Sequence, residues 1–251
     1  MNIESEDNTF KNLMEYARAM HKRYFHALSA FYVYEGLSEA TAPNIVGQVL
    51  AENNTKVISN FINFFMPTKE ALRVYFLLEL AKMLDSSESA LHINKILTIT
   101  EGNLKNLTVD AFKEYNQGRV FIEELAAEYR SLDYKEVSLL RDMIDKNKVL
   151  IERLKIYRDK WLAHDDIKKP EPPLISRGDV GTLFGVLEKI LNFITGKLNS
   201  ESWAYSRVED ESKHHTRLVI DYLRRFEPYR LAEIQKEFDE DMRLYGSENK
   251  N

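Results

Sequence analysis

Between Asp133 and Pro170 the sequence contains neither glycine nor proline, the two residues that interrupt helices most effectively. Asp133 is followed by Glu136 three residues later, a pair typical of the capping box that begins a helix. From Val137 to Trp161 apolar residues recur in steps of three and four, as they do along one face of an α-helix. The pattern predicts a helix of about 30 residues, or ~45 Å, that ends before Pro170.

The rest of the chain has the same character. Its 251 residues include only nine Gly and six Pro, and helical periodicity extends through most of it without a convincing strand. We therefore predict an all-α fold, a helical bundle of about seven to eight helices with a C-terminal helical extension. We expect the bundle domain to occupy residues 1–200 and a separate helical arm to occupy residues 201–251.

Several helix starts follow from residues that cap a helix N-terminus. Ser, Thr and Asp side chains favour this position because they accept hydrogen bonds from the first backbone N–H groups. Helices are expected to begin at Thr68 after Pro67, at Thr108 and continue to about Arg130, and at Ser176 with Asp179 and continue to Leu198. A last helix is expected from about Ser212 to Tyr245.

Composition excludes several classes of protein. The chain has no Cys, which excludes a disulfide framework, a thiolate metal site and a cysteine nucleophile. The first ten residues, MNIESEDNTF, are polar and acidic, unlike a secretory signal. No apolar run approaches the roughly 18–20 residues that a membrane span requires. We expect a cytoplasmic protein that makes no membrane contact.

The net charge of −5 does not indicate a nucleic-acid-binding domain, which is usually basic. Charge is distributed unevenly, however. Residues 145–169 carry eight basic and five acidic side chains, whereas residues 227–251 carry four basic and seven acidic ones. The basic segment is either a modest electrostatic footprint for an anionic partner or an ordinary helix surface of mixed charge.

Three polar residues interrupt the apolar face of the helix predicted after Asp133, namely Asn147, Arg158 and His164. At about 100° per residue, Arg158 and His164 lie about 120° apart on an ideal α-helix, with Trp161 midway between them. A guanidinium at that position costs several kcal/mol of desolvation unless a charge or a ligand satisfies it. Either the two side chains form a site, or Arg158 extends to solvent and His164 only complements the helix dipole.

Residues 157–166 read YRDKWLAHDD, in which five residues separate Arg158 from His164 and Asp159 follows the arginine. This string resembles the signature of the HEPN superfamily of small helical nucleases, an Arg usually followed by Asn, Asp or His, and then a His a few residues later. The fuller string is similar to the abortive-infection (AbiU-like) branch, in which an R-D/N-K-x-x-A-H core is typical. Residues 77–89, LLELAKMLDSSES, also resemble that branch, which tends to carry a helix ending in an Asp before a short Ser-rich or Pro-rich turn. The resemblance spans roughly residues 28–198.

The resemblance implies a metal-independent endoribonuclease without a cofactor, and the residue types suit that chemistry. RNA carries its own nucleophile, the 2′-hydroxyl, so the enzyme must supply a proton acceptor and a group that stabilises phosphoryl charge. His164 can act as the general base or acid, and Arg158 as the stabiliser of the transition state. Asp159 can orient either of them, although on an ideal helix it points about 100° away from Arg158. The expected products are 2′,3′-cyclic phosphate and 5′-hydroxyl ends.

HEPN proteins generally form two-fold dimers that bring two motifs to one composite cleft. The resemblance therefore implies a homodimer with an isologous contact, for which we predict the interface residues Asn147, Leu154 and Trp161. The residues predicted to bind RNA are Lys155, Lys160, Lys168, Lys169 and Tyr157. The aromatic side chains have an alternative role in the core or at the interface.

Two hypotheses from different classes follow. The first is a ribonuclease toxin of phage defence or of a toxin–antitoxin pair, with RNA as substrate and an antitoxin protein as a possible partner. The second is a catalytically inactive helical module that binds RNA or a protein. A purely structural bundle is a third reading. A neighbouring gene for a small antitoxin or a nucleotidyltransferase favours the first, and an Arg158–His164 pair buried without a solvent-reachable cleft favours the second.

Overall fold

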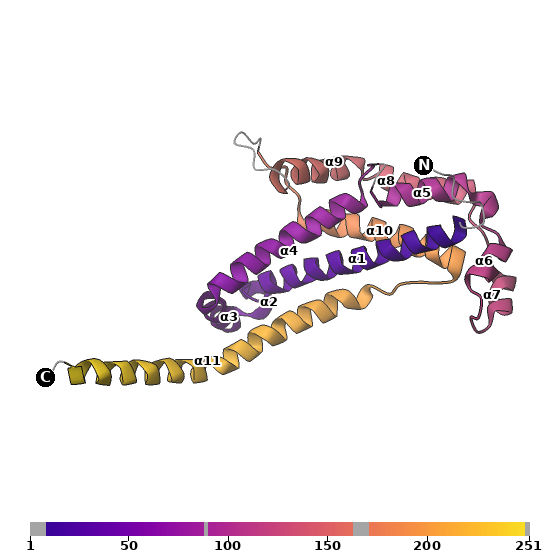
Figure 1. The fold of residues 1–251 in the computed structure, drawn as a ribbon. Helices are drawn as coiled ribbons and strands as arrows, with labels where there is room; N and C mark the ends of the chain where they lie inside the picture. The colour runs from indigo at the N-terminus through magenta and orange to yellow at the C-terminus, as the bar shows by residue number, and fades with distance from the viewer. Residues whose placement is uncertain (1–8, 88–89, 163–170, 249–251) are drawn as a thin grey trace. The chain divides into compact units, whose positions relative to one another are not determined.

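The structure is a computed structural model that describes residues 9–87, 90–162 and 171–248. In these residues every regular element is a helix, and no strand occurs (Figure 1). The predicted all-α class is thus confirmed. The α-helices, in chain order, are α1 (Thr9–Glu39), α2 (Pro43–Val46), α3 (Gln48–Asn60), α4 (Ile62–Met83), α5 (Ile93–Gly102), α6 (Val109–Tyr115), α7 (Ile122–Glu128), α8 (Tyr134–Asp145), α9 (Lys148–Tyr157), α10 (Arg177–Asn199) and α11 (Ser206–Glu248). None of the helices in the described part of the chain is long and apolar enough to cross a bilayer.

The chain divides into two compact units, whose boundaries fall inside helices. Unit 1 comprises Met1–Ala30 and Arg73–Arg207, and unit 2 comprises Phe31–Leu72 and Val208–Asn251. Both α1 and α4 contribute to each unit, because the division between the units falls within them. The expected division therefore stays a prediction, with a bundle domain over residues 1–200 and an arm over residues 201–251.

Unit 1 is organised around α10, which buries one long face. Its residues Leu183, Leu187, Ile190, Ile194 and Leu198 are all fully buried and recur in steps of three and four. Helix α8 packs against both α10 and α5. Burial of five large aliphatic side chains at about 1.5–3 kcal/mol each makes α10 a major source of stability in this unit.

Unit 2 has a smaller core in which segments far apart in the sequence meet. Leu37, Ala40, Phe65 and Ile220 are buried together, and Leu223 packs against them. A Cβ added at Gly36 would lie only 3.1 Å from the Cβ of Thr216, so the glycine permits the close approach of α1 and α11.

Three predicted helix starts are confirmed, because each depends on local chemistry. The Thr108 hydroxyl accepts a hydrogen bond from the Ala111 N–H at the start of α6. Asp133 and Glu136 form the predicted capping box of α8. Ser176 forms another with Asp179 at the start of α10.

The predicted start at Thr68 is wrong, since α4 begins at Ile62 and contains Pro67. The chain already turns helical at Phe61, whose carbonyl accepts bonds from the N–H groups of residues 64 and 65. Proline removes one hydrogen bond from the helix. A break at this point would displace Phe65 from the core of unit 2, so packing overrides the local signal.

Two predicted long helices are each divided. The helix expected from Thr108 to about Arg130 is interrupted by Gly118, which has a φ of 86°, and becomes α6 and α7. The helix expected after Asp133 is interrupted at Asn147, whose side-chain amide donates to the Met143 carbonyl at 2.9 Å. The Asn147 N–H donates instead to the Ile144 carbonyl. The Asn147 side chain thus takes the place of its own backbone N–H at the Met143 carbonyl, and α8 ends although no Gly or Pro is present.

Candidate functional site

The segment that carries the arginine motif is a π-helix rather than a continuation of the α-helix. Helix α9 ends at Tyr157, and the π-helix η3 follows over Arg158–Leu162. Single π-helical turns are rare and are found frequently at functional sites. The angle of about 120° expected between Arg158 and His164 assumed α-helical geometry, so it does not apply to a π-helix. His164 itself lies outside the described residues.

Arg158 is held by two carboxylates from different parts of the chain. Its Nε donates to Asp159 Oδ1 at 2.6 Å, and its Nη1 donates to Asp85 Oδ2 at 2.8 Å. The Arg158 side chain is 19% exposed. The hydrogen bond to Asp159, followed by that to Asp85, raises the pKa of Arg158 despite the opposing effect of burial. Nη2 has no hydrogen-bond partner in the described part of the chain, so one edge of the guanidinium is available to a ligand.

Asp85 lies just beyond the end of α4 and organises the positive charges around it. Burial raises its pKa, but the Ser86 N–H, Arg158 and Lys155 together outweigh burial and hold the pKa of Asp85 below its ordinary value. The Ser86 N–H donates to Oδ1 at 2.8 Å, and Lys155 Nζ lies 3.6 Å from the same oxygen. Asp85 is therefore a fixed anion between two cations.

Asp159 contacts Arg158 directly, which the ideal-helix argument did not anticipate. Its carboxylate is 53% exposed, compared with 22% for Asp85. The exposed carboxylate can be displaced or moved more easily than the one anchored by Ser86. The four charged groups of the cluster, Arg158, Lys155, Asp85 and Asp159, sum to zero, so the cluster by itself offers little net attraction for an anion.

Tyr157 is held by Arg73 of α4. Arg73 Nη1 donates to the Tyr157 hydroxyl at 2.5 Å, and its guanidinium lies 5.9 Å from the ring centroid. The hydroxyl and one face of the Tyr157 ring are thus engaged inside the chain, and stacking of the ring on a base stays a prediction.

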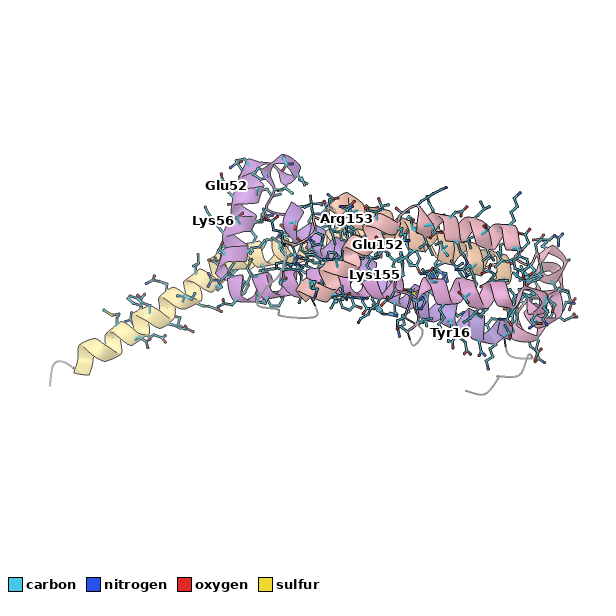
Figure 2. The ribbon with its side chains drawn as sticks, turned by 90° about the horizontal axis from the view of Figure 1, so that it is seen from above. Tyr16, Glu52, Lys56, Glu152, Arg153 and Lys155 are labelled. Carbon is cyan, nitrogen blue, oxygen red and sulfur yellow. The ribbon has the colours of Figure 1, made fainter. Side chains whose placement is uncertain are left out.

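The predicted RNA-binding lysines differ in their surroundings. Figure 2 shows Lys155 on α9 together with Glu152 and Arg153. Lys155 donates to Ser86 Oγ at 3.4 Å as well as pairing with Asp85, whereas Lys160 is exposed on the π-helix. Lys168 and Lys169 lie outside the described residues, so the structure does not place half of the predicted set.

The three predicted interface residues also differ in their exposure. Leu154 is fully buried inside the chain, so its side chain already packs in the core of unit 1. Asn147 sits at the start of α9, and Asn147 and Trp161 are both partly exposed. These two retain surface that a second copy can contact.

Sequence reasoning about a single helix missed the residues that come from elsewhere. Asp85, Ser86 and Arg73 all belong to the α4 end of the site, far from the motif in sequence. Arg153 was missed as well; it donates to the Leu174 carbonyl at 3.1 Å and ties the segment before α10 to α9. A signal for Asp85 did exist, because it is the aspartate of the LLELAKMLDSSES segment.

An open pocket of about 480 Å³ adjoins this cluster through Ser86. It is lined by Ser86, His92, Asn94, Lys95, Thr98 and Ile99. The Asn94 side chain donates to the Asp85 carbonyl at 3.3 Å, so a residue that lines the pocket contacts a residue of the charged cluster. In the described part of the chain, no group of three or more His, Asp or Glu side chains is placed to hold a metal ion.

Comparison with known proteins gives one match. The model of the HEPN_AbiU2 family, described as AbiU2, matches residues 10–219. No curated protein and no solved structure matches the chain. The match includes the π-helix and the end of α4, and it ends within α11.

Proposed function

The chain belongs to the HEPN_AbiU2 family, a HEPN-type family related to abortive infection, and on that premise we propose that it is a metal-independent endoribonuclease. Its biological role in this proposal is that of a toxin in phage defence or in a toxin–antitoxin system. The single observation that carries the proposal is the placement of Arg158. Arg158 lies in a π-helix, six residues before His164. Two carboxylates orient its guanidinium, and the edge at Nη2 remains for a phosphate.

The proposed reaction needs only groups of the protein and of RNA. His164 takes the proton from a 2′-hydroxyl, whose oxygen then attacks the adjacent phosphorus. Arg158 stabilises the negative charge that develops on the non-bridging oxygens. The bond to the 5′-oxygen breaks, and that oxygen leaves with a proton supplied by an imidazolium. The products are a 2′,3′-cyclic phosphate and a 5′-hydroxyl.

Asp85 and Asp159 have positioning roles in this mechanism. Each fixes one nitrogen of the guanidinium, so the fork has few orientations left when substrate arrives. Preorganisation of this kind lowers the barrier because no reorientation is needed in the transition state. Asp159 was expected to be catalytic, and its contact with Arg158 supports an orienting role.

A homodimer completes the proposed site. The single histidine of one motif cannot serve as base and acid in the same step, whereas two motifs that face each other across a two-fold axis supply both. Asn147 and Trp161 are the proposed contacts that retain surface for this interface. Lys155, Lys160, Lys168, Lys169 and Tyr157 are the proposed contacts to RNA, and an antitoxin protein is a possible partner.

The second candidate function is binding without cleavage. The observation that favours it is the neutral charge of the cluster, in which both cations and both carboxylates are already paired. Such a clamp can be purely structural. An RNA-binding or protein-binding HEPN module would retain the fold and the cluster but would leave RNA intact.

The two functions are separated by cleavage of total RNA in EDTA by the purified protein, beside His164→Ala and His26→Ala variants. His26 is an exposed histidine on α1 and serves as the matched control. Cyclic-phosphate ends from the wild type and His26→Ala, but not from His164→Ala, are the expected result. Intact RNA in every reaction, with each protein folded, would favour the binding module.

A further inference from the structure

The open pocket beside the Arg158 cluster lies wholly within unit 1. Its walls come from the turn after α4 and from the start of α5, with the lining residues Ser86, His92, Asn94, Lys95, Thr98 and Ile99. We call it the α5 pocket. Its volume of about 480 Å³ falls in the range of ~300–1,000 Å³ that is typical of pockets for small organic ligands. The α5 pocket is therefore large enough for one nucleotide.

The α5 pocket adjoins the charged cluster through two of its lining residues. The Ser86 hydroxyl accepts a hydrogen bond from Lys155 Nζ at 3.4 Å, and the Ser86 N–H donates to Asp85 at 2.8 Å. The Asn94 side chain donates to the Asp85 carbonyl. Asp85 in turn holds Arg158. A nucleic-acid strand with one phosphate at Arg158 therefore has this pocket beside it for the neighbouring nucleotide.

Lys95 supplies a positive charge that nothing in the described part of the chain neutralises. Its Nζ lies 5.8 Å from the centroid of the Tyr16 ring, which Figure 2 labels, and no carboxylate of the described residues pairs with it. Lys95 also lies in the first turn of α5, which contains no acidic residue. A cation at that end opposes the helix dipole, so Lys95 does not stabilise α5. Its charge is available to an anion from another molecule.

The other two cations beside the α5 pocket are held by carboxylates. Arg141, which contacts a lining threonine, donates to Glu101 at 2.7 Å. Lys155 pairs with Asp85 at 3.6 Å and belongs to the cluster whose charges sum to zero. Lys95 therefore provides the positive charge that the cluster lacks for attracting a phosphate.

The uncharged lining groups suit binding rather than reaction. His92 Nδ1 accepts a hydrogen bond from the Lys95 N–H at 3.1 Å, and its Nε2 donates to the Ser87 carbonyl at 2.8 Å. Because both ring nitrogens are engaged, His92 caps α5 and is not free to act as an acid or a base. The side-chain carbonyl of Asn94 accepts no hydrogen bond within the described residues, and Ile99 adds an apolar wall.

We propose that the α5 pocket binds one nucleotide of an RNA strand, next to the phosphate at Arg158. The phosphate of this nucleotide lies at Lys95 Nζ, its ribose and base lie against Ile99, and a base N–H group donates to the Asn94 carbonyl. The inference rests on the proposed function, because it takes the phosphate at Arg158 to be that of the scissile bond. In this arrangement the cluster orients one phosphate and Lys95 attracts the next.

The first test measures RNA binding apart from cleavage. Every protein carries His164→Ala, so that a short fluorescent RNA stays intact during titration, and Lys95→Met is compared with Lys189→Met. Methionine retains an unbranched stem without the charge. Lys189 is exposed on α10 and does not line the α5 pocket. Lys95→Met should raise the Kd about fivefold at low salt and lower the salt slope by about 0.7, whereas Lys189→Met should change the Kd less than about twofold.

The outcomes separate this inference from the proposed function. Equal affinity with and without Lys95→Met, or no RNA binding at all, overturns the inference, even when the wild type cuts RNA. A wild type that leaves RNA intact, combined with weaker binding by Lys95→Met, retains the nucleotide site and removes the nuclease. Circular dichroism of each variant shows whether its fold is retained.

The second test places the neighbouring phosphate along the strand. A short RNA that the wild type cuts at one mapped bond receives a neutral methylphosphonate at the linkage directly before or directly after that bond. One of these two substitutions should lower kcat/KM of the wild type about fivefold and leave that of Lys95→Met unchanged, because the same contact cannot be lost twice. Equal losses in the two proteins at both linkages overturn the placement of the neighbouring phosphate at Lys95.

Discussion

The π-helix Arg158–Leu162 and the exposed end of α11, residues 231–243, differ in how far the contacts within a single chain satisfy them. At the π-helix Arg158 lies between two counter-charges, Asp85 and Asp159. Along residues 231–243 every side chain is exposed, including those of large apolar residues. The first region lies inside the family match, and the second lies outside it.

This difference indicates what each region can contact in another molecule. A guanidinium oriented by two carboxylates is ready for a ligand, because its position is already fixed. Exposed apolar side chains offer a surface to another molecule but no oriented group. We therefore propose that the chemistry takes place at the π-helix, and substitutions there can test this role.

The largest effect is expected from His164→Ala. Loss of the proton acceptor should lower the rate of RNA cleavage by about 10²–10⁴-fold. Single-turnover cleavage measures this rate, and circular dichroism of the same sample should show an unchanged fold. Wild-type activity in this variant would remove His164 from the mechanism.

Arg158→Ala should cost on the order of 3–4 kcal/mol of transition-state stabilisation. The loss should appear in kcat more than in KM, because the proposed contact strengthens as charge develops on the phosphate. Arg158→Lys tests the role of the fork, since a lysine retains the charge but cannot hold Asp85 and Asp159 at two separate nitrogens. Full activity of Arg158→Lys would show that only charge matters at this position.

Acid should destabilise unit 1 through His21, well away from the motif in sequence. Burial lowers the pKa of His21 to about 4, partly opposed by a hydrogen bond at the Leu191 backbone, and Nδ1 lies 2.6 Å from the Tyr205 hydroxyl. Between pH ~6.5 and pH ~4 the unfolded chain binds a proton that the folded chain does not, so the free energy of unfolding falls as pH falls. The loss over this window is about 3 kcal/mol at most.

Urea unfolding at pH 7 and pH 5 measures this effect. His21→Asn should reduce the difference in unfolding free energy between the two pH values, whereas His26→Asn should preserve it. An identical pH dependence in wild type and His21→Asn would show that other groups cause the acid sensitivity.

Asp85→Asn should lower the cleavage rate by about tenfold, because a neutral amide holds the guanidinium less firmly. In an Arg158→Ala background the same substitution should add little, since Asp85 acts through Arg158. The control is Ser38→Ala, which also removes a side-chain hydrogen-bonding group but lies in unit 2. Additive losses in the double variant would give Asp85 an independent role.

The smallest expected effect separates two lysines. Lys160→Ala should reduce the salt dependence of RNA binding by about one unit of slope if Lys160 contacts a phosphate. Lys155→Ala should reduce it less, because the Lys155 side chain is only 29% exposed, whereas Lys160 is exposed. Equal slopes for the two variants, measured by titration at several salt concentrations, would contradict this difference.

Much of the fold follows from local signals in the sequence. The caps at Thr108, Asp133 and Ser176 were predicted correctly because a side chain and a backbone N–H three residues away decide them. The continuation of α4 through Pro67 and the break at Asn147 were not predicted. The first depends on the burial of Phe65 in unit 2, and the second on a side-chain bond to Met143.

Of the candidate site, only the residues of the motif could be predicted from the sequence. The residues of YRDKWLAHDD pointed to Arg158 and His164, but the contact between Arg158 and Asp85 joins residues 73 positions apart. The π-helical turn also has no simple sequence signature, so ideal α-helical angles misplaced Asp159 relative to Arg158. Resemblance drew attention to the Asp85 segment, and only the fold shows that the two segments meet.

The proposed mechanism requires RNA to supply its own nucleophile at the site of Arg158 and His164. It is tested most directly with a short RNA that the wild type cuts at a mapped bond, compared in EDTA with the same RNA carrying one 2′-deoxynucleotide on the 5′ side of that bond. The proposed mechanism predicts that cleavage at this bond stops while other bonds are still cut. Cleavage of the deoxy-substituted bond at an undiminished rate would contradict it.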